Sequence, residues 1–159
     1  MSLAIVPGSF DPMTLGHLDV VEQALKQYDE VVVAVMVNAQ KQTTFDMETR
    51  VAIAERTVEH LERVRVISDT GMLIDLFDEL GADVIIKGIR GSADLEYEMI
   101  HAKWNKEHNP RLETLFLPAD ESLVSVSSTH VRELLNGGKY AELRGILADS
   151  AIEYLKEGK

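Results

Sequence analysis

The stretch LAIVPGSFDPMTLGHLDVVEQALKQY (residues 3–28) decides the fold. Its first four residues are apolar and predict a buried strand. Residues 17–28 predict an amphipathic helix, because one face would carry only apolar and aromatic side chains: Leu18, Val21, Ala24, Leu25 and Tyr28. The connection between strand and helix holds two glycines and two prolines, with hydroxyl groups and an imidazole among them. A plain turn needs only one glycine or proline, so this connection indicates a binding loop.

The same alternation of apolar and amphipathic stretches continues along the chain. Further strands are predicted at 31–37, 64–67, 83–87 and 114–117, and helices at 47–61, 72–80 and 92–108, with two or three short helices at the end. Asp46 would cap the second helix and Gly81 would end the third. This order predicts an α/β fold, a doubly wound, five-stranded parallel sheet of Rossmann-like type with C-terminal helices. Since no linker or repeat interrupts it, we expect residues 1–159 to form a single domain.

Composition excludes several classes of function. The chain of 159 residues has no cysteine, which excludes disulfides, thiolate metal sites and a cysteine nucleophile. Its net charge of −11 makes nucleic acid an unfavourable partner. The longest apolar run, VVVAVMV at 31–37, is too short to span a bilayer, and no signal peptide opens the chain. We therefore expect a cytoplasmic protein with no membrane partner.

In open parallel sheets, ligands bind beyond the carboxyl ends of the strands, so the loops there matter most. In the first loop, Gly16 and His17 stand where the helix begins, which is a place that binds phosphate. His17 would present a ring N–H there, and Ser9 a hydroxyl. The loop is neither a G-x-G-x-x-G nor a G-x-x-x-x-G-K-[ST] motif, which disfavours hydride transfer and P-loop chemistry.

Two later loops add cations. Lys41 follows the second strand, and taken alone it is more simply a solvated loop residue than a ligand. The stretch KGIRGSADLEYE (residues 87–98) places Lys87 and Arg90 around two glycines at a helix start, which predicts a second phosphate cradle. Asp94 and Glu98 lie four residues apart, hence on one face of that helix.

The stretch SVSSTHVREL (residues 125–134) places several hydroxyls at another helix start. A plain cap needs one hydroxyl, whereas a run of them suits phosphate. Arg132 could reach the same anion or point to solvent. Four histidines show no metal-binding spacing and are interpreted as surface or structural: His60, His101, His108 and His130. Tyr97 and Trp104 are interpreted as packing or subunit-contact residues.

GSFDPMTLGH, KGIRGSADLEYE and SVSST, in this order, resemble the nucleotidyltransferase superfamily marked by a T/H-x-G-H motif, here residues 14–17. Within it the chain resembles the bacterial phosphopantetheine adenylyltransferases over nearly its whole length. That family uses ATP and Mg²⁺ to adenylylate 4′-phosphopantetheine, giving dephospho-coenzyme A and pyrophosphate, the penultimate step of coenzyme A biosynthesis. The resemblance implies an enzyme with a nucleotidyltransferase fold. It also implies a homohexamer of two trimers, with coenzyme A as a candidate feedback ligand.

The resemblance also implies roles for individual residues. On the ATP side these are Ser9, Phe10, His17, Gly88, Ile89, Arg90, Glu98, Leu123, Val124, Ser125, Val126, Ser127, Ser128 and Thr129. On the phosphopantetheine side they are Ser9, Lys41, Leu73 and Lys87, and no metal-ligating residue is implied. Many members have Thr, Arg and an aromatic residue where this chain has Ser9, Lys87 and Leu123. The hydroxyl and the charge are kept, but the forked geometry of Arg is lost.

The chemistry requires no general base, since the attacking phosphate oxygen is already ionised near neutral pH. We expect His17, Lys41 and Arg90 to be the catalytic residues, acting by positioning and charge stabilisation without a covalent enzyme intermediate. A close alternative is a nicotinate or nicotinamide mononucleotide adenylyltransferase, whose S-S-T-x-x-R signature appears at residues 127–132. A cytidylyltransferase and a non-catalytic ATP sensor are further alternatives.

Overall fold

A computed structural model of the chain describes residues 1–37, 43–118 and 128–157. The described residues form a sheet of five parallel strands, in the order β3-β2-β1-β4-β5: β1 (Leu3–Gly8), β2 (Glu30–Met36), β3 (Val64–Asp69), β4 (Val84–Ile89) and β5 (Thr114–Pro118). The chain therefore winds outward from β1 in both directions, which confirms the predicted α/β Rossmann-like class.

The helices also follow the predicted order. They are α1 (Leu15–Leu25), α2 (Met47–Val58), α3 (Leu73–Leu80), α4 (Ser92–His108), α5 (Ser128–Asn136), the 3₁₀ turn η2 (Tyr140–Leu143) and α6 (Asp149–Glu157). Asp46 caps α2 by accepting the Thr49 N–H at 2.8 Å, and Gly81 ends α3 with a φ of 65°. Both predicted caps are confirmed. Several boundaries near the loops of interest are shifted: α1 begins two residues earlier than predicted, and β1, β3 and β4 each end two residues later. Lys87 therefore lies within β4 rather than at its end.

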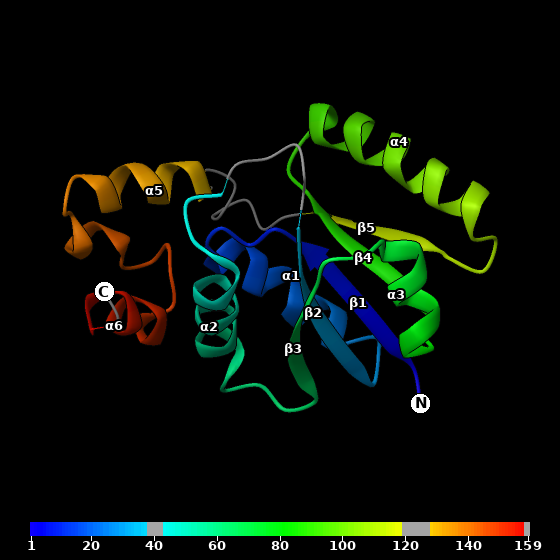
Figure 1. The fold of residues 1–159 in the computed structure, drawn as a ribbon, viewed down its shortest axis with the longest axis horizontal. Coiled ribbons are helices and arrows are strands. Elements are labelled where there is room, and N and C mark those ends of the chain that lie inside the picture. Colours follow the sequence, from blue (N-terminus) through cyan, green and yellow to red (C-terminus); the bar gives the residue numbers. More distant parts are fainter. Residues whose placement is uncertain (38–42, 119–127, 158–159) are drawn as a thin grey trace.

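The sheet is covered on both faces, as Figure 1 shows. Successive residues of β1 point to opposite sides, so that Val6 belongs to the core with α1 and α2 while Ile5 belongs to the core with α3. Both side chains are buried. This double burial is the reason that the central strands are nearly continuous apolar runs.

The C-terminal helices form a third small core at one end of the molecule, on the other side from α3 and α4 (Figure 1). Polar contacts also join this C-terminal region to α1 and α2, two of the helices that cover the sheet. The Ser150 hydroxyl donates to the Arg56 carbonyl at 2.8 Å, and the Leu15 N–H donates to the Ile146 carbonyl at 2.8 Å. The start of α1 is therefore held partly by the far end of the chain.

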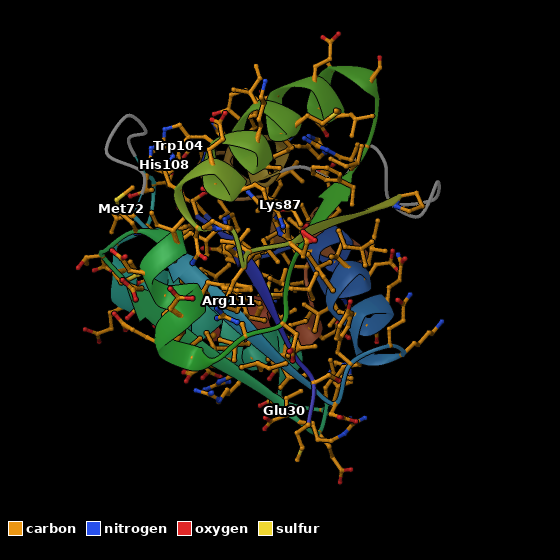
Figure 2. All side chains as sticks on the ribbon, turned by 90° about the vertical axis from the view of Figure 1, so that its right-hand side faces the viewer. Glu30, Met72, Lys87, Trp104, His108 and Arg111 are labelled. Atoms are coloured by element: carbon orange, nitrogen blue, oxygen red, sulfur yellow. The ribbon has the colours of Figure 1, made fainter. Side chains whose placement is uncertain are left out.

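The carboxyl ends of the parallel strands meet at one edge of the sheet. Figure 2 shows Lys87, near the end of β4, lying beneath α4, and Glu30, which begins β2, at the opposite end of the strands. Because β1 and β4 are neighbours in a sheet that winds in both directions, the switch point lies between them. Within the ranges that the structure describes, no helix is long and apolar enough to cross a membrane.

Candidate functional site

The loop after β1 holds His17 through a reciprocal pair of hydrogen bonds. The Thr14 N–H donates to His17 Nδ1 at 2.9 Å, and the His17 N–H donates to Thr14 Oγ1 at 3.4 Å. This is a capping box in which histidine replaces the usual Glu or Gln. A nitrogen that accepts an N–H carries no proton, so this contact assigns the hydrogen of the neutral ring to Nε2. The ring is thereby oriented as a donor.

This geometry corrects the prediction that His17 opens the helix. His17 is the third helical residue, because Thr14 lies outside the helix as its N-cap. The spacing Thr-x-x-His contains this information, since a side-chain acceptor three residues after a threonine can complete the box. Thr14, not Gly16, is therefore the residue at which the helix boundary lies.

The free N–H groups of the α1 start are fewer than the motif suggests. The Leu15 N–H is bonded to Ile146, and that of His17 to Thr14. The Gly16 N–H has no partner among the described residues. An anion at this helix start would therefore use Gly16 and the His17 ring rather than the whole first turn.

The ring of Phe10 packs against the ring of His17. Its side chain is buried, and the edge of one ring meets the face of the other, with centroids 5.0 Å apart at 77°. Its φ of 45° lies in the left-handed region, which is uncommon and strained for a bulky residue. The ring of Phe10 is thus committed to His17 and to the core. Gly8 lies close to the same ring, with a hypothetical Cβ 3.2 Å from it.

Near the end of β4, Lys87 and Glu98 form an ion pair. Lys87 Nζ lies 3.0 Å from Glu98 Oε1, and each side chain is about one quarter exposed, at 24% and 22%. This Glu98 oxygen is buried and accepts no hydrogen bond from the described residues, so its contact with Lys87 is an ion pair without a hydrogen bond. The resemblance implied that the two residues contact different ligands. The structure brings them together, so a phosphate that binds Lys87 must compete with Glu98.

Arg90 and Asp94 form a second, more exposed ion pair. Asp94 Oδ2 lies 3.2 Å from Arg90 Nε and also accepts the Arg90 N–H at 3.2 Å. Together with Gly91 and Ala93 they line a shallow hollow of about 240 Å³. Asp94 contacts the guanidinium at Nε, which leaves the two terminal nitrogens outside this ion pair.

Gly88 has a packing role that the sequence did not reveal. A Cβ at this position would lie 2.6 Å from Val20 Cγ2, so that only glycine lets β4 approach α1 this closely. Ile89 follows as the half-buried last residue of β4. Leu73 is the first residue of α3, and its side chain packs against the core on that face of the sheet.

Asp11 and Arg50 are buried polar residues that the sequence analysis missed. The Asp11 carboxylate accepts the N–H of Thr44 at 2.8 Å and of Phe45 at 2.9 Å. Arg50 Nη1 donates to the Ser9 carbonyl at 2.9 Å. No local pattern identifies them, because their partners lie 33, 34 and 41 residues away along the chain.

Arg132 is not simply solvated, which was one of the two roles considered for it above. Its Nη1 donates to the Asp11 carbonyl at 2.7 Å, and its side chain is only 24% exposed. α5 is thereby tied to the loop after β1 across 121 residues of sequence.

Several predicted site residues cannot be placed. Lys41 lies outside the described residues, as do Leu123, Val124, Ser125, Val126 and Ser127. Ser128 and Thr129 open α5, but their side chains are not described. Among the described residues, no three His, Asp or Glu side chains are placed to hold a metal ion.

Known proteins share this sequence and fold. A family described as cytidylyltransferase-like matches residues 5–134. A phosphopantetheine adenylyltransferase of Finegoldia magna is 39% identical over 153 residues, which covers 96% of this chain and 93% of that protein. A solved structure from Vibrio parahaemolyticus, of a protein proposed as a nicotinate-nucleotide adenylyltransferase, has a TM-score of 0.76. It covers 99% of this chain and all of its own at 20% identity, so it supports the fold alone.

The family match spans most of the sheet, and the match to the Finegoldia magna protein covers nearly the whole chain. The chain is therefore a nucleotidyltransferase enzyme, and it belongs to the phosphopantetheine adenylyltransferases.

Proposed function

We propose that this enzyme transfers the adenylyl group of ATP to 4′-phosphopantetheine, giving dephospho-coenzyme A and pyrophosphate in the penultimate step of coenzyme A biosynthesis. The observation that carries the proposal is that donor and cationic side chains lie near the ends of two neighbouring strands, β1 and β4. His17 is held as an N–H donor after β1, while Lys87 and Arg90 follow one another on β4 and its loop. Two such regions suit two phosphorylated ligands that meet at the switch point.

The proposed reaction is a single in-line displacement. An oxygen of the phosphopantetheine phosphate attacks the α-phosphorus of ATP and forms the new P–O bond. The bond from the α-phosphorus to the bridging oxygen breaks, and pyrophosphate leaves with its electron pair. No proton has to be removed from the nucleophile, so the protein contributes position and charge stabilisation.

Each catalytic residue has a separate task in this proposal. His17 donates Nε2–H to the α-phosphate oxygens as charge builds on them. Lys41 holds the attacking phosphate beside the α-phosphate. Arg90 and the hydroxyl-rich start of α5 hold the β- and γ-phosphates, for which the terminal nitrogens of Arg90 are suited by their forked geometry. Lys87 binds the acceptor.

Magnesium enters this scheme as part of the substrate, MgATP. Mg²⁺ retains several waters and prefers phosphate oxygens, so it needs few protein ligands in such enzymes. Its requirement can be tested by adding EDTA to the assay, which should stop turnover until Mg²⁺ is restored.

The assay measures pyrophosphate release by the purified protein with MgATP and one of three additions: 4′-phosphopantetheine, nicotinate mononucleotide or buffer. Mass spectrometry identifies the adenylylated product. Release with phosphopantetheine alone, with dephospho-coenzyme A as product, is the expected result. Release only with the mononucleotide would overturn the proposed acceptor, and ATP binding without release in any reaction would support a sensor.

We further propose a homohexamer, and the outer surface of α4 supports it. All residues of α4 are described and none is buried, and four large apolar or aromatic side chains are exposed: Tyr97, Met99, Ile100 and Trp104. Exposed apolar side chains gathered on one helix are typical of a contact between copies. Light scattering would test this, the expected mass being six times the 17.7 kDa of the chain. Coenzyme A, which contains the acceptor's pantetheine arm, is the proposed feedback ligand and should compete with phosphopantetheine.

A further inference from the structure

Asp11 is a buried carboxylate that the proposed chemistry does not use. Its side chain is only 3% exposed, in the loop between β1 and α1. A buried charge is costly unless it is well hydrogen-bonded. Asp11 meets this requirement with one backbone N–H on each oxygen, since Oδ2 accepts from Thr44 and Oδ1 from Phe45.

A third contact comes from the opposite end of the chain. Arg132 Nη1 lies 3.7 Å from Asp11 Oδ2 and donates to the Asp11 backbone carbonyl at 2.7 Å. Asp11 thus joins three segments: its own loop, the stretch just before α2, and α5. The positive charge of Arg132 also offsets the carboxylate, which limits the repulsion that Asp11 would exert on a phosphate nearby.

These three segments are ones that the proposed function places around the phosphates. The loop after β1 carries Ser9 and His17, the second segment continues the connection from β2, and α5 begins with the hydroxyl-rich stretch. Arg50 makes separate contacts with the same loop. Its Nη1 donates to the carbonyls of Ser9 at 2.9 Å and of Met36 at 3.4 Å. Arg50, on α2, therefore joins the loop after β1 to the end of β2, whereas Asp11 also reaches α5.

We propose that Asp11 is a positioning residue for adenylyl transfer, an inference that rests on the proposed function. Its carboxylate fixes the three segments relative to one another and does not touch substrate. Only a carboxylate accepts N–H groups with both of its oxygens. An asparagine of the same shape has one acceptor, and its amide would face a backbone N–H, donor against donor.

The first experiment compares wild type with Asp11→Asn, using Asp46→Asn as a matched control. Asp46 is an exposed aspartate one residue after Phe45, and it also accepts a backbone N–H, but only to cap α2. A displacement on the order of 1 Å can cost about 100-fold in rate, so we expect kcat of Asp11→Asn to fall roughly 10- to 100-fold. The control should stay within about twofold, as an amide caps a helix nearly as well. Hydrogen exchange at Thr44 and Phe45 should accelerate in Asp11→Asn.

A purely structural role would lower the melting temperature and leave kcat of the folded fraction unchanged. A double-mutant cycle separates the two roles, because residues that act together show non-additive losses. Asp11→Asn should cost less in a His17→Ala background than in wild type. With Lys87→Ala, on β4, the two losses should multiply. If the fold-losses in kcat of the single variants multiplied in both cycles, the positioning role would be overturned.

Arg132→Met is the second variant, in case Asp11→Asn does not fold. It removes the tie to α5 and leaves both backbone N–H bonds of Asp11, so kcat should fall about 3- to 10-fold, less than the loss on the order of 100-fold for full misplacement. If kcat were unchanged in every folded variant, the positioning role would be overturned. The proposed function would still stand, provided that the wild type transfers adenylyl to phosphopantetheine. A wild type that transfers nothing to phosphopantetheine would overturn both.

Discussion

The loop after β1 and the start of α4 bring polar groups to the same edge of the sheet in different ways. In the loop, Phe10, Asp11 and Thr14 are each less than 5% exposed, and the contacts of Phe10 and Thr14 fix the ring of His17. At α4 the polar side chains are between 22% and 47% exposed and are held by ion pairs. One region is rigidly packed, and the other is held by contacts that water can replace.

This difference indicates different contributions to the reaction. Donors fixed in advance stabilise charge that develops in the transition state, because no reorganisation is needed at that moment. The exposed Arg90–Asp94 pair contributes little to stability, so Arg90 can exchange its carboxylate partner for substrate phosphate at low cost. Lys87 must instead leave Glu98, whose side chain is only 22% exposed. We therefore expect the loop to control kcat and the β4–α4 region to control substrate binding.

The largest expected effect comes from the packed loop. His17→Ala removes one preorganised donor, so kcat should fall on the order of 10²- to 10³-fold. Steady-state kinetics with both substrates saturating measure this loss. His60→Ala, at an exposed position two residues after the end of α2, is the control and should leave kcat unchanged. Near-wild-type turnover of His17→Ala would remove the histidine from the mechanism.

The next effect sharpens the contrast at β4. Lys87→Ala removes a charge-assisted contact to the acceptor, so the KM for phosphopantetheine should rise roughly 10- to 100-fold, with kcat changed much less. Lys106→Ala removes a cation from another ion pair, with Glu113, and should leave both constants near wild type. If Lys87→Ala raised only the KM for ATP, the division of the site between the substrates would be wrong.

A third prediction concerns the packing between the two regions. Gly88→Ala would place a methyl group 2.6 Å from Val20 Cγ2 and force β4 away from α1, at a cost of about 1–3 kcal/mol. The nearby Gly91 has extended backbone and nothing within 4 Å of a hypothetical Cβ. Denaturant unfolding should show a loss for Gly88→Ala and almost none for Gly91→Ala. Equal losses would mean that Gly88 is not required by packing.

The smallest effect is a pH dependence on the α4 side of the molecule. Hydrogen bonds from Arg111 and then Asn109 lower the pKa of Asp78 from its ordinary value of 3.8. Because the folded pKa is the lower one, this contact stabilises the fold above about pH 4 and is lost as the pH falls through the folded pKa. Asp78→Asn should therefore show a shallower loss of stability below that pH in urea unfolding. Parallel acid profiles of variant and wild type would contradict it.

Much of the fold could be predicted from local sequence. The strands are continuous apolar runs because both faces of the sheet are covered, and the caps at Asp46 and Gly81 act within a few residues of themselves. The residues at the strand ends could be selected as site candidates because parallel strands share one carboxyl edge.

The remainder depends on contacts between distant residues. Asp11 meets Arg132 across 121 positions, and Gly88 is needed because of Val20 on another element. No periodicity encodes such pairs. The Lys87–Glu98 ion pair was missed for another reason, since both residues had been assigned to substrates and not to each other.

The central claim is that the loop after β1 acts in the transition state more than in binding. The most direct test is calorimetric titration of MgATP into wild type and His17→Ala, beside the kcat of the same preparations. The account predicts dissociation constants within about threefold of each other while kcat differs on the order of 10²-fold or more. A loss of ATP affinity as large as the loss of kcat would contradict it, because His17 would then bind ground state and transition state alike.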